Sequence, residues 1–325
     1  MIIFGLGVED LADTHFALAP LEETVLSLRV LREPGLYALH LPWRRSALAR
    51  LDPHDTRLLA SLVGRRRALP DFLTPPPATF APTFEEQLSV ARRTPPEVVR
   101  RDLQAALVPE PVPDDVAAIR FRDAACDVLQ RYWQLTIEPL WPQIRLVLEA
   151  DMTYRARQLA VGGARLLFAD MHPNLRWHDG ALFIDQMIGR HHVAAAGRGL
   201  LLMPSVFAHK PAPPVHPEEP PRLTYPSRGV ATLWARAPAP DATALVALLG
   251  ASRAGLLDLL GEPLPTVELA RRLQVTPSAV SQHLRVLYAT GLVTRTRDGR
   301  QVLYRRSPLG DQLADPPQTH RPTPP

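Results

Sequence analysis

The 325-residue chain contains very little cysteine and lysine. Cys126 is the one cysteine, so no disulfide can form within the chain and no thiolate metal cluster can be built. Lys210 is the one lysine, so arginine supplies nearly all of the positive charge. Abundant arginine, proline, alanine and leucine are typical of GC-rich coding sequences. Arginine content alone is therefore poor evidence for nucleic-acid binding, and the position of the charge matters more.

Long hydrophobic runs are also absent from the sequence. No stretch approaches the roughly 18 apolar residues of a membrane span, so we expect no contact with a membrane. Residues 1–13 have no basic region and include Glu9 and Asp10, so we expect no signal peptide. Hydrophobic residues make up 46% and charged residues 22% of the chain, which is typical of a globular protein. We expect a cytoplasmic location.

Proline-rich segments divide the chain into regions of different periodicity. Helical patterns fill the first 161 residues, with Asp52-Pro53 and two capping boxes, Thr83–Glu86 and Thr94–Glu97, as start signals and Gly162-Gly163 as a stop signal. Short apolar runs follow and predict strands: ARLLFADM, ALFIDQ, GLLLMPSVF, RLTYP and GVATLWA. The predicted fold class is α+β.

The expected domain organisation follows from these patterns. We predict an N-terminal helical domain with a small, mostly antiparallel sheet at residues 1–236, and a linker at 237–241. A C-terminal winged helix-turn-helix domain is predicted at 242–313, and a disordered tail at 314–325.

Positive charge is concentrated near the C-terminus. Residues 262–307 carry eight arginines against three acidic residues, which is a net charge of +5. The whole chain has a formal net charge of +4, so the remaining residues carry −1. A short basic unit beside a near-neutral body is typical of a DNA-binding module.

The C-terminal segment has the periodicity of four short helices, expected at residues 242–250, 252–262, 265–273 and 276–290. Ser252 and Thr266 are expected to cap the second and third helices. Thr276 is expected to cap the fourth helix, where Pro277 takes the first helical position and its missing N–H does no harm. Gly291 is expected to end this helix.

The fourth helix divides its residues between two faces. Apolar residues at helical spacing are expected to face the core, namely Val280, Leu284, Leu287 and Tyr288. The polar residues lie mostly away from them and gather toward the N-terminal end, namely Ser278, Ser281, Gln282, His283 and Arg285. A plain surface helix would more often carry Glu and Lys there.

A predicted hairpin follows this helix. Two β-rich runs flank Asp298-Gly299, the strongest short hairpin signal, and arginines bracket the turn. A helix-turn-helix followed by a basic hairpin predicts a winged helix, which inserts its recognition helix into the major groove. Gln282 suits adenine, and Arg285 suits phosphate or guanine. We predict double-stranded DNA as the partner, contacted by Thr276, Ser278, Ser281, Gln282, His283, Arg285, Arg295, Arg297 and Arg300.

Residues 244–307 resemble the winged-helix domain of ArsR-type bacterial repressors. The resemblance is carried by LARRLQVTPSAVSQHLRVLYATGLVTRTRDGRQVLYRRS, in which Ser281-Gln282-His283-Leu284 and Gly291-Leu292-Val293 are specific. It implies a nucleoid-associated homodimer on a palindromic operator that represses transcription until an effector, here unidentified, binds. The segments GRGLLLMPSVF and LTYPSRGVATLW resemble an uncharacterised N-terminal domain of larger regulators of this type, which implies no activity.

The chain departs from the metal-sensing members of that family. Their third helix carries a cysteine pair, whereas Val267-Glu268-Leu269-Ala270-Arg271 occupies this position. Their other metal site needs a long final helix, whereas the chain beyond Leu313 is short and proline-rich. We therefore expect no metal at these sites and no cofactor. The helix at 242–250 or the N-terminal domain would have to supply the dimer interface.

The N-terminal domain shows no known catalytic spacing. His172, His178, His191 and His192 lie near acidic residues but lack HExxH or HxH spacing, so we interpret them as surface or core histidines rather than zinc ligands. Cys126 is interpreted as a buried structural residue. Arg228, in YPSRGV, could turn inward and would then need a carboxylate partner. Four aromatic residues could line an apolar pocket, but such residues more often pack in a core: Tyr132, Trp133, Trp141 and Trp177.

Three hypotheses remain open at the level of sequence. The first is a non-enzymatic dimeric transcriptional regulator whose N-terminal domain holds the effector or partner surface. The second is an enzyme or ligand-processing domain fused to a DNA reader. The third is an interaction module whose winged helix binds protein. Salt-dependent binding to duplex DNA would separate the first from the third.

Overall fold

The computed structural model divides into two compact units, Met1–Ala235 and Arg236–Pro325, which are described separately. The structure describes residues 1–64, 67–108, 113–187, 189–214, 219–234, 242–298 and 301–314. The linker predicted at 237–241 lies outside the described residues. Ala314, which was assigned to the disordered tail, is instead the last residue of a helix. Residues 315–325 of the predicted tail also lie outside them.

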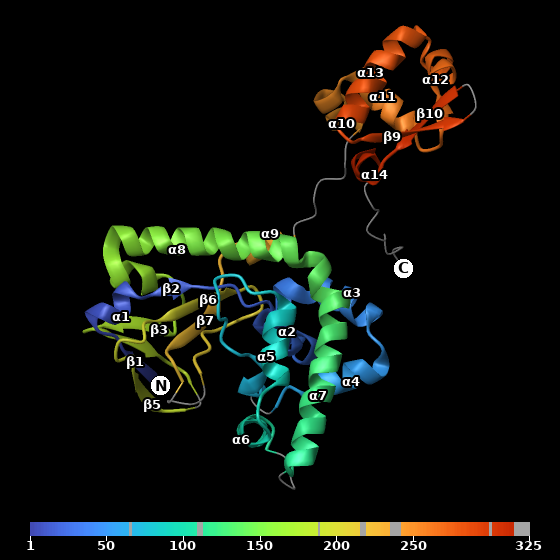
Figure 1. Cartoon of the computed structure of the whole chain (residues 1–325). Coiled ribbons are helices and arrows are strands. Elements are labelled where there is room, and N and C mark those ends of the chain that lie inside the picture. The colour runs from blue at the N-terminus through green and yellow to red at the C-terminus, as the bar shows by residue number, and fades with distance from the viewer. Residues whose placement is uncertain are drawn as a thin grey trace. The chain divides into compact units, whose positions relative to one another are not determined.

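The first unit mixes helices with short strands (Figure 1). Its helices are α1 (Val8–Ala12), α2 (Pro20–Arg32), α3 (Leu41–Arg50), α4 (Pro53–Ser61), α5 (Phe84–Arg92), α6 (Pro96–Ala106), α7 (Asp115–Tyr132), α8 (Trp141–Ala169) and α9 (Val230–Leu233). Its strands are β1 (Ile2–Gly5), β2 (His15–Phe16), β3 (Leu175–His178), β4 (Ala181–Ile184), β5 (His191–Ala194), β6 (Leu201–Ser205) and β7 (Arg222–Pro226). The mixed helix and sheet composition predicted from the sequence is present.

The strand pairing differs from the predicted small, mostly antiparallel sheet. One sheet has the order β3-β4-β1-β5, in which β1 pairs antiparallel with β4 but parallel with β5. A second sheet has the order β2-β6-β7, and both of its pairings are parallel. The first sheet is mostly antiparallel as predicted, since β3 also pairs antiparallel with β4, but the parallel second sheet contradicts the prediction. Strand direction is set by pairing between distant segments, which local alternation of residues does not reveal.

Two of the predicted strands are helical. ARLLFA belongs to the end of α8, and GVATLWA contains α9. Short apolar runs fit a strand or a buried helical segment equally well, so periodicity could not separate them. The runs ALFIDQ, GLLLMPSVF and RLTYP do contain strands, namely β4, β6 and β7.

The helix start signals were confirmed at two of three positions. The side chain of Asp52 accepts a hydrogen bond from the His54 N–H at 2.7 Å, and Thr83 and Glu86 form a complete capping box. The box predicted at Thr94–Glu97 is wrong, because Pro95 is the N-cap of α6 and offers no side-chain acceptor. The stop at Gly162-Gly163 is a break inside α8, where both glycines leave helical geometry and Gly163 has φ +61°.

Two hydrophobic cores hold the first unit together, and α8 contributes to both. The helical core includes Tyr132 and Trp133, and α8 adds Ile144 and Leu148. The core under the sheets takes Leu167 and Phe168 from the part of α8 beyond the break. The tryptophans at 133 and 141 therefore pack in or against a core, as the sequence suggested.

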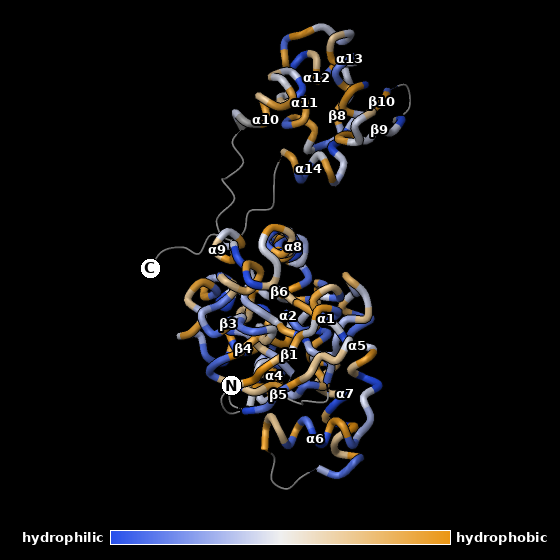
Figure 2. The backbone as a smooth tube through the Cα atoms, turned by 90° about the vertical axis from the view of Figure 1, so that its left-hand side faces the viewer, coloured by the Kyte–Doolittle hydropathy of each residue, from blue (hydrophilic) through white to orange (hydrophobic). Residues whose placement is uncertain are grey.

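Hydrophobic and hydrophilic residues are interleaved along the helices rather than gathered into long apolar segments (Figure 2). In keeping with this, none of the helices in the described ranges is both long and apolar enough to cross a membrane.

The second unit is a small helical bundle with a three-stranded sheet of order β8-β10-β9. It consists of α10 (Ala242–Leu249), α11 (Ala251–Leu259), β8 (Leu264–Pro265), α12 (Thr266–Leu273), α13 (Pro277–Ala289), β9 (Val293–Asp298), β10 (Gln301–Arg306) and α14 (Pro308–Ala314). Its core takes residues from α11, α12, α13 and the start of β9. The final helix α14 is an element that the sequence pattern did not predict.

Candidate nucleic-acid interface

The turn between α12 and α13 is tight. Gln274 ends α12 in the left-handed region, at φ 54° and ψ 41°, and the Val275 N–H donates to the Ala270 carbonyl at 3.1 Å. Thr276 then caps α13, because its hydroxyl accepts from the Ala279 N–H at 3.3 Å, and Pro277 occupies the first helical position. The predicted cap and turn are confirmed here.

The two upstream caps were predicted wrongly. Gly250, not Ser252, precedes α11, and Ser252 lies within the helix. Pro265 precedes α12, and Thr266 is its first helical residue without a capping bond. In both cases the helix begins one or two residues earlier than the sequence pattern predicted. The exact ends of helices are the part of a helix that sequence patterns define least well.

The core face of α13 matches the prediction at three of four positions. Val280, Leu284 and Leu287 are buried. Tyr288 is 44% exposed, so its assignment to the core was wrong. Its ring instead lies 4.5 Å from the guanidinium carbon of Arg295 on β9, a cation–π contact that joins the helix to the hairpin.

The opposite face of α13 presents the polar residues to solvent. Ser278, Ser281, Gln282 and Arg285 are exposed, whereas His283 is half-buried. Thr276 is also exposed, but its hydroxyl is occupied by the capping bond. The exposed side chains follow the helix from its N-terminal turn, and no carboxylate of a described residue forms an ion pair with Arg285.

The hairpin predicted around Asp298-Gly299 is present in the strand pairing. β9 and β10 are antiparallel, with Val293 opposite Arg306 and Asp298 opposite Gln301. Arg295 and Arg297 are exposed on β9. Gly299 and the predicted contact residue Arg300 lie outside the described residues.

The arginines of this unit fall into two groups. Arg271 and Arg272 both bind Glu268, at 2.7 and 2.8 Å, and their hydrogen bonds lower the pKa of Glu268 to about 2. Arg306 pairs with Asp311 of α14 at 3.0 Å. Arg285 on α13 and Arg295 and Arg297 on β9 are exposed, so these two elements carry the cationic surface. Arg305 on β10 is also exposed and was not among the predicted contacts.

Comparison with known proteins agrees with this geometry. Residues 249–296 match the helix-turn-helix domain family, so this part of the chain is a helix-turn-helix domain. The chain is also 42% identical over 79 residues to the HTH-type transcriptional regulator NmtR of Mycobacterium tuberculosis (strain H37Rv). That alignment spans 24% of this chain and 66% of NmtR, slightly less than two thirds of the relative. No solved structure matches the chain.

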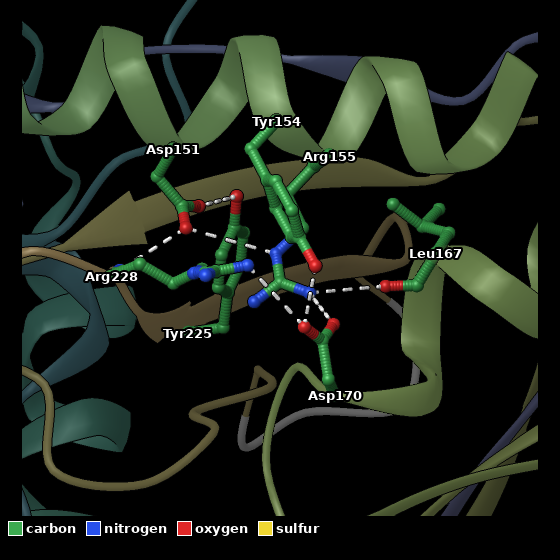
Figure 3. Close-up of polar contacts among 7 residues, drawn as sticks. All are labelled: Asp151, Tyr154, Arg155, Leu167, Asp170, Tyr225 and Arg228. Atoms are coloured by element: carbon green, nitrogen blue, oxygen red, sulfur yellow. Dashed lines mark hydrogen bonds and ion pairs between the residues drawn. The ribbon is translucent and has the colours of Figure 1, made fainter.

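The first unit contains a buried ionic cluster built on α8 (Figure 3). Arg155 is fully buried and pairs with Asp170 just beyond the helix and, at 3.7 Å, with Asp151 one turn earlier. The Tyr225 hydroxyl donates to Asp151 at 2.8 Å, so the cluster also holds β7. Arginine and carboxylate charges offset one another there, which indicates a structural role.

Arg228 pairs with a carboxylate, as the sequence predicted for this residue. Its backbone N–H donates to Asp151 at 3.1 Å, and its guanidinium lies 3.4 Å from Asp170 and over the ring of Tyr154 (Figure 3). Its side chain stays 51% exposed, so the guanidinium does not turn into the core. Burial opposes ionisation of Asp170, but the Tyr154 hydrogen bond and the two arginines lower its pKa.

The histidines of the first unit do not gather around a common point with acidic residues. Across the described ranges, no group of three or more His, Cys, Asp or Glu side chains could hold a metal ion. His178 and His192 are exposed, and the half-buried His172 accepts from the Asn174 N–H at 3.0 Å. Cys126 is buried, as expected, and burial raises the pKa of its thiol to about 11.

Proposed function

We propose that this protein is a transcriptional repressor that binds a palindromic DNA operator as a homodimer and responds to an effector through its first unit. One observation carries the proposal: Ser278, Ser281, Gln282 and Arg285 of α13 are exposed. They share a matched helix-turn-helix domain with the arginine-bearing β9, which contacts α13 through Arg295 and Tyr288. A helix that only filled a core would not need these side chains.

In this proposal α13 enters the major groove by its N-terminal end. Ser278, Ser281 and Gln282 then reach base edges, and Gln282 makes the bidentate contact that favours adenine. Arg295, Arg297 and Arg300 act as a wing that contacts phosphate or the minor groove, and Arg285 and His283 contact the flanking backbone. The Tyr288–Arg295 contact holds the start of the wing against the recognition helix.

Binding of the full chain to duplexes selected from a random library tests the proposal. Affinity should fall steeply with rising salt, because arginine–phosphate contacts release counterions.

Two variants separate base recognition from phosphate contact. Gln282→Ala should weaken binding to the preferred site by about 1–3 kcal/mol and relax the sequence preference of the protein. Arg297→Ala should weaken binding to all sequences and reduce the salt slope by about one unit.

The matched control is Arg145→Ala in the first unit, an exposed arginine paired with Glu149, which should leave DNA affinity unchanged. Affinity that does not depend on salt would contradict DNA binding and favour a protein partner for the second unit. A Gln282 variant that keeps the original sequence preference would contradict the placement of α13 in the groove.

A further inference from the structure

A cavity of about 310 Å³ lies inside the first unit, and segments distant in sequence surround it. Its wall combines α2, the end of α6, residues 67–74, residues 209–214 and Arg222 of β7. Among the described residues, its lining includes the cations Arg29, Arg67, Lys210 and Arg222. We refer to this space as the cationic cavity.

The cations of the cavity lie close enough to one another to oppose ionisation. Burial lowers the pKa of Lys210, and the charges of Arg67 and Arg29 lower it further. Burial likewise lowers the pKa of Arg29, whose Nε donates to the Arg67 carbonyl at 3.0 Å. An anion placed among these groups would relieve the repulsion.

The carboxylates around the cavity are largely occupied with other partners. Glu33 pairs with Arg67 at 3.2 Å, and Glu219 pairs with Arg222 at 3.2 Å. Asp102 pairs with Arg101 at 3.0 Å, and Asp71 offsets part of the charge of Arg29. Among the described residues, none of these carboxylates forms an ion pair with Lys210, a half-buried residue that lines the cavity.

Glu22 adds a polar group aimed at the same region. It is buried in α2, its Oε1 accepts from the Thr224 hydroxyl, and its Oε2 has no hydrogen-bond partner. Burial raises the pKa of this carboxyl, although the charges of Arg222 and Arg29 and the Thr224 hydrogen bond act in the opposite direction. The oxygen without a partner can donate a hydrogen bond to a ligand when the carboxyl is protonated and can accept one when it is ionised.

Apolar side chains form much of the remaining wall, which also includes Thr74, His191 and His209. Leu26, Leu69, Met187, Ile2 and the prolines of residues 211–214 face the cavity. A small inorganic anion would leave this surface uncovered, whereas a ligand with a hydrocarbon body would cover it.

We propose that the cationic cavity binds a small organic carboxylate with an apolar body, whose carboxylate group is held by Lys210 and Arg29. Naming this ligand as the effector rests on the proposed regulatory function, but the binding itself does not. The carboxylate takes charge-assisted hydrogen bonds from the two cations, and the hydrocarbon part packs on the apolar wall.

The single lysine of the chain makes the test selective. An amine-directed acylating reagent can modify Lys210 and the terminal amine, and mass spectrometry of the digested full-length protein separates the two sites. The probes are acetate, hexanoate, benzoate and 2-naphthoate, each compared with its neutral amide at millimolar concentration. We expect the larger carboxylates to slow acylation of Lys210, acetate to protect little, and the amides not to protect.

Calorimetric titration of variants with the best carboxylate completes the test. Lys210→Met should weaken binding roughly tenfold or more, because it removes a charge-assisted contact. Lys210→Arg should keep most of the affinity, and Arg145→Met serves as a control outside the cavity.

Three outcomes would overturn the proposal: no protection by any carboxylate, equal protection by the amides, or unchanged affinity of Lys210→Met. All measurements are made without DNA. A protein that binds carboxylates but not duplex DNA would therefore refute the regulatory function alone, and the reverse result would refute the cavity alone.

Discussion

At the scale of single residues, Glu23 shows how burial changes a carboxyl group. It lies on α2 with 2% of its surface exposed, and its Oε1 accepts from the Val206 N–H at 3.1 Å. Burial raises the pKa of Glu23 to about 8, although the hydrogen bonds from residues 205–207 act in the opposite direction. The folded protein therefore holds a proton that the unfolded chain releases at lower pH.

The sign of the resulting pH dependence follows from this difference. The pKa of Glu23 is higher in the folded protein than in the unfolded chain. Its contribution to the free energy of unfolding is therefore fully present below about pH 4.5 and is lost as pH rises toward about 8. Glu23→Gln is neutral throughout and keeps the acceptor for Val206. The variant should gain unfolding free energy relative to the wild type, by up to about 1.4 kcal/mol per pH unit across this window.

Urea unfolding at about pH 5.5 and about pH 7.5 measures the effect. The exposed Glu85→Gln is the control, because it removes one carboxylate without changing a buried site. A gain for Glu23→Gln that is no larger at the higher pH would contradict a buried, protonated Glu23.

At the scale of elements, α14 completes the second unit by close backbone packing. Gly310 is buried where the helix meets the start of β9, and a Cβ there would lie 2.1 Å from the Leu292 carbonyl oxygen. The Ser307 hydroxyl accepts from the Gly310 N–H at 3.1 Å and donates to the Gly291 carbonyl at 2.6 Å. These contacts join α14 to the turn at Gly291, directly after α13.

Gly310→Ala should therefore force α14 away from β9 and destabilise the second unit by about 1–3 kcal/mol. Gly255→Ala in α11 is the matched control, because its Cβ would meet only the end of the Leu273 side chain at 3.6 Å. That control should be neutral or stabilising by about 0.5–1 kcal/mol, since alanine favours a helix over glycine. Calorimetric unfolding of both variants checks the contrast, and equal transitions would contradict the close packing of α14.

At the scale of the whole molecule, two compact units divide the charge unevenly. The segment 262–307 carries +5, whereas the rest of the chain carries −1. In the proposed function, electrostatic attraction to DNA would therefore belong to the second unit, whereas the cationic cavity lies in the first. A regulator of this design would place DNA recognition and ligand recognition on separate units.

If the chain acts as a homodimer, two copies should bind one palindromic duplex, with half-sites one helical turn of about 34–36 Å apart. Sedimentation of the full chain with a selected duplex should then give a mass of two chains per DNA. A duplex in which half of the palindrome is scrambled is the control and should bind much more weakly. One chain per duplex, with full affinity for the scrambled control, would contradict the dimer.

Much of the second unit could be predicted from the sequence because its signals are local. The cap at Thr276, the buried stripe Val280–Leu284–Leu287 and the hairpin around Asp298 each depend on residues a few positions apart. Helical periodicity predicted that Tyr288 is buried, whereas its ring is exposed and contacts Arg295 on another element. Local signals do not reveal contacts of this kind.

The sequence by itself determined the helix-turn-helix segment, its polar face and the concentration of arginine near the C-terminus, because helical periodicity, caps and turn residues act over short distances. The tertiary structure alone decided the parallel pairing of β1 with β5 and of β6 with β7, since pairing joins distant segments. It also decided the surroundings of Lys210. The sequence shows only a lone lysine, and folding brings α2, residues 67–74 and β7 around it to form a cavity.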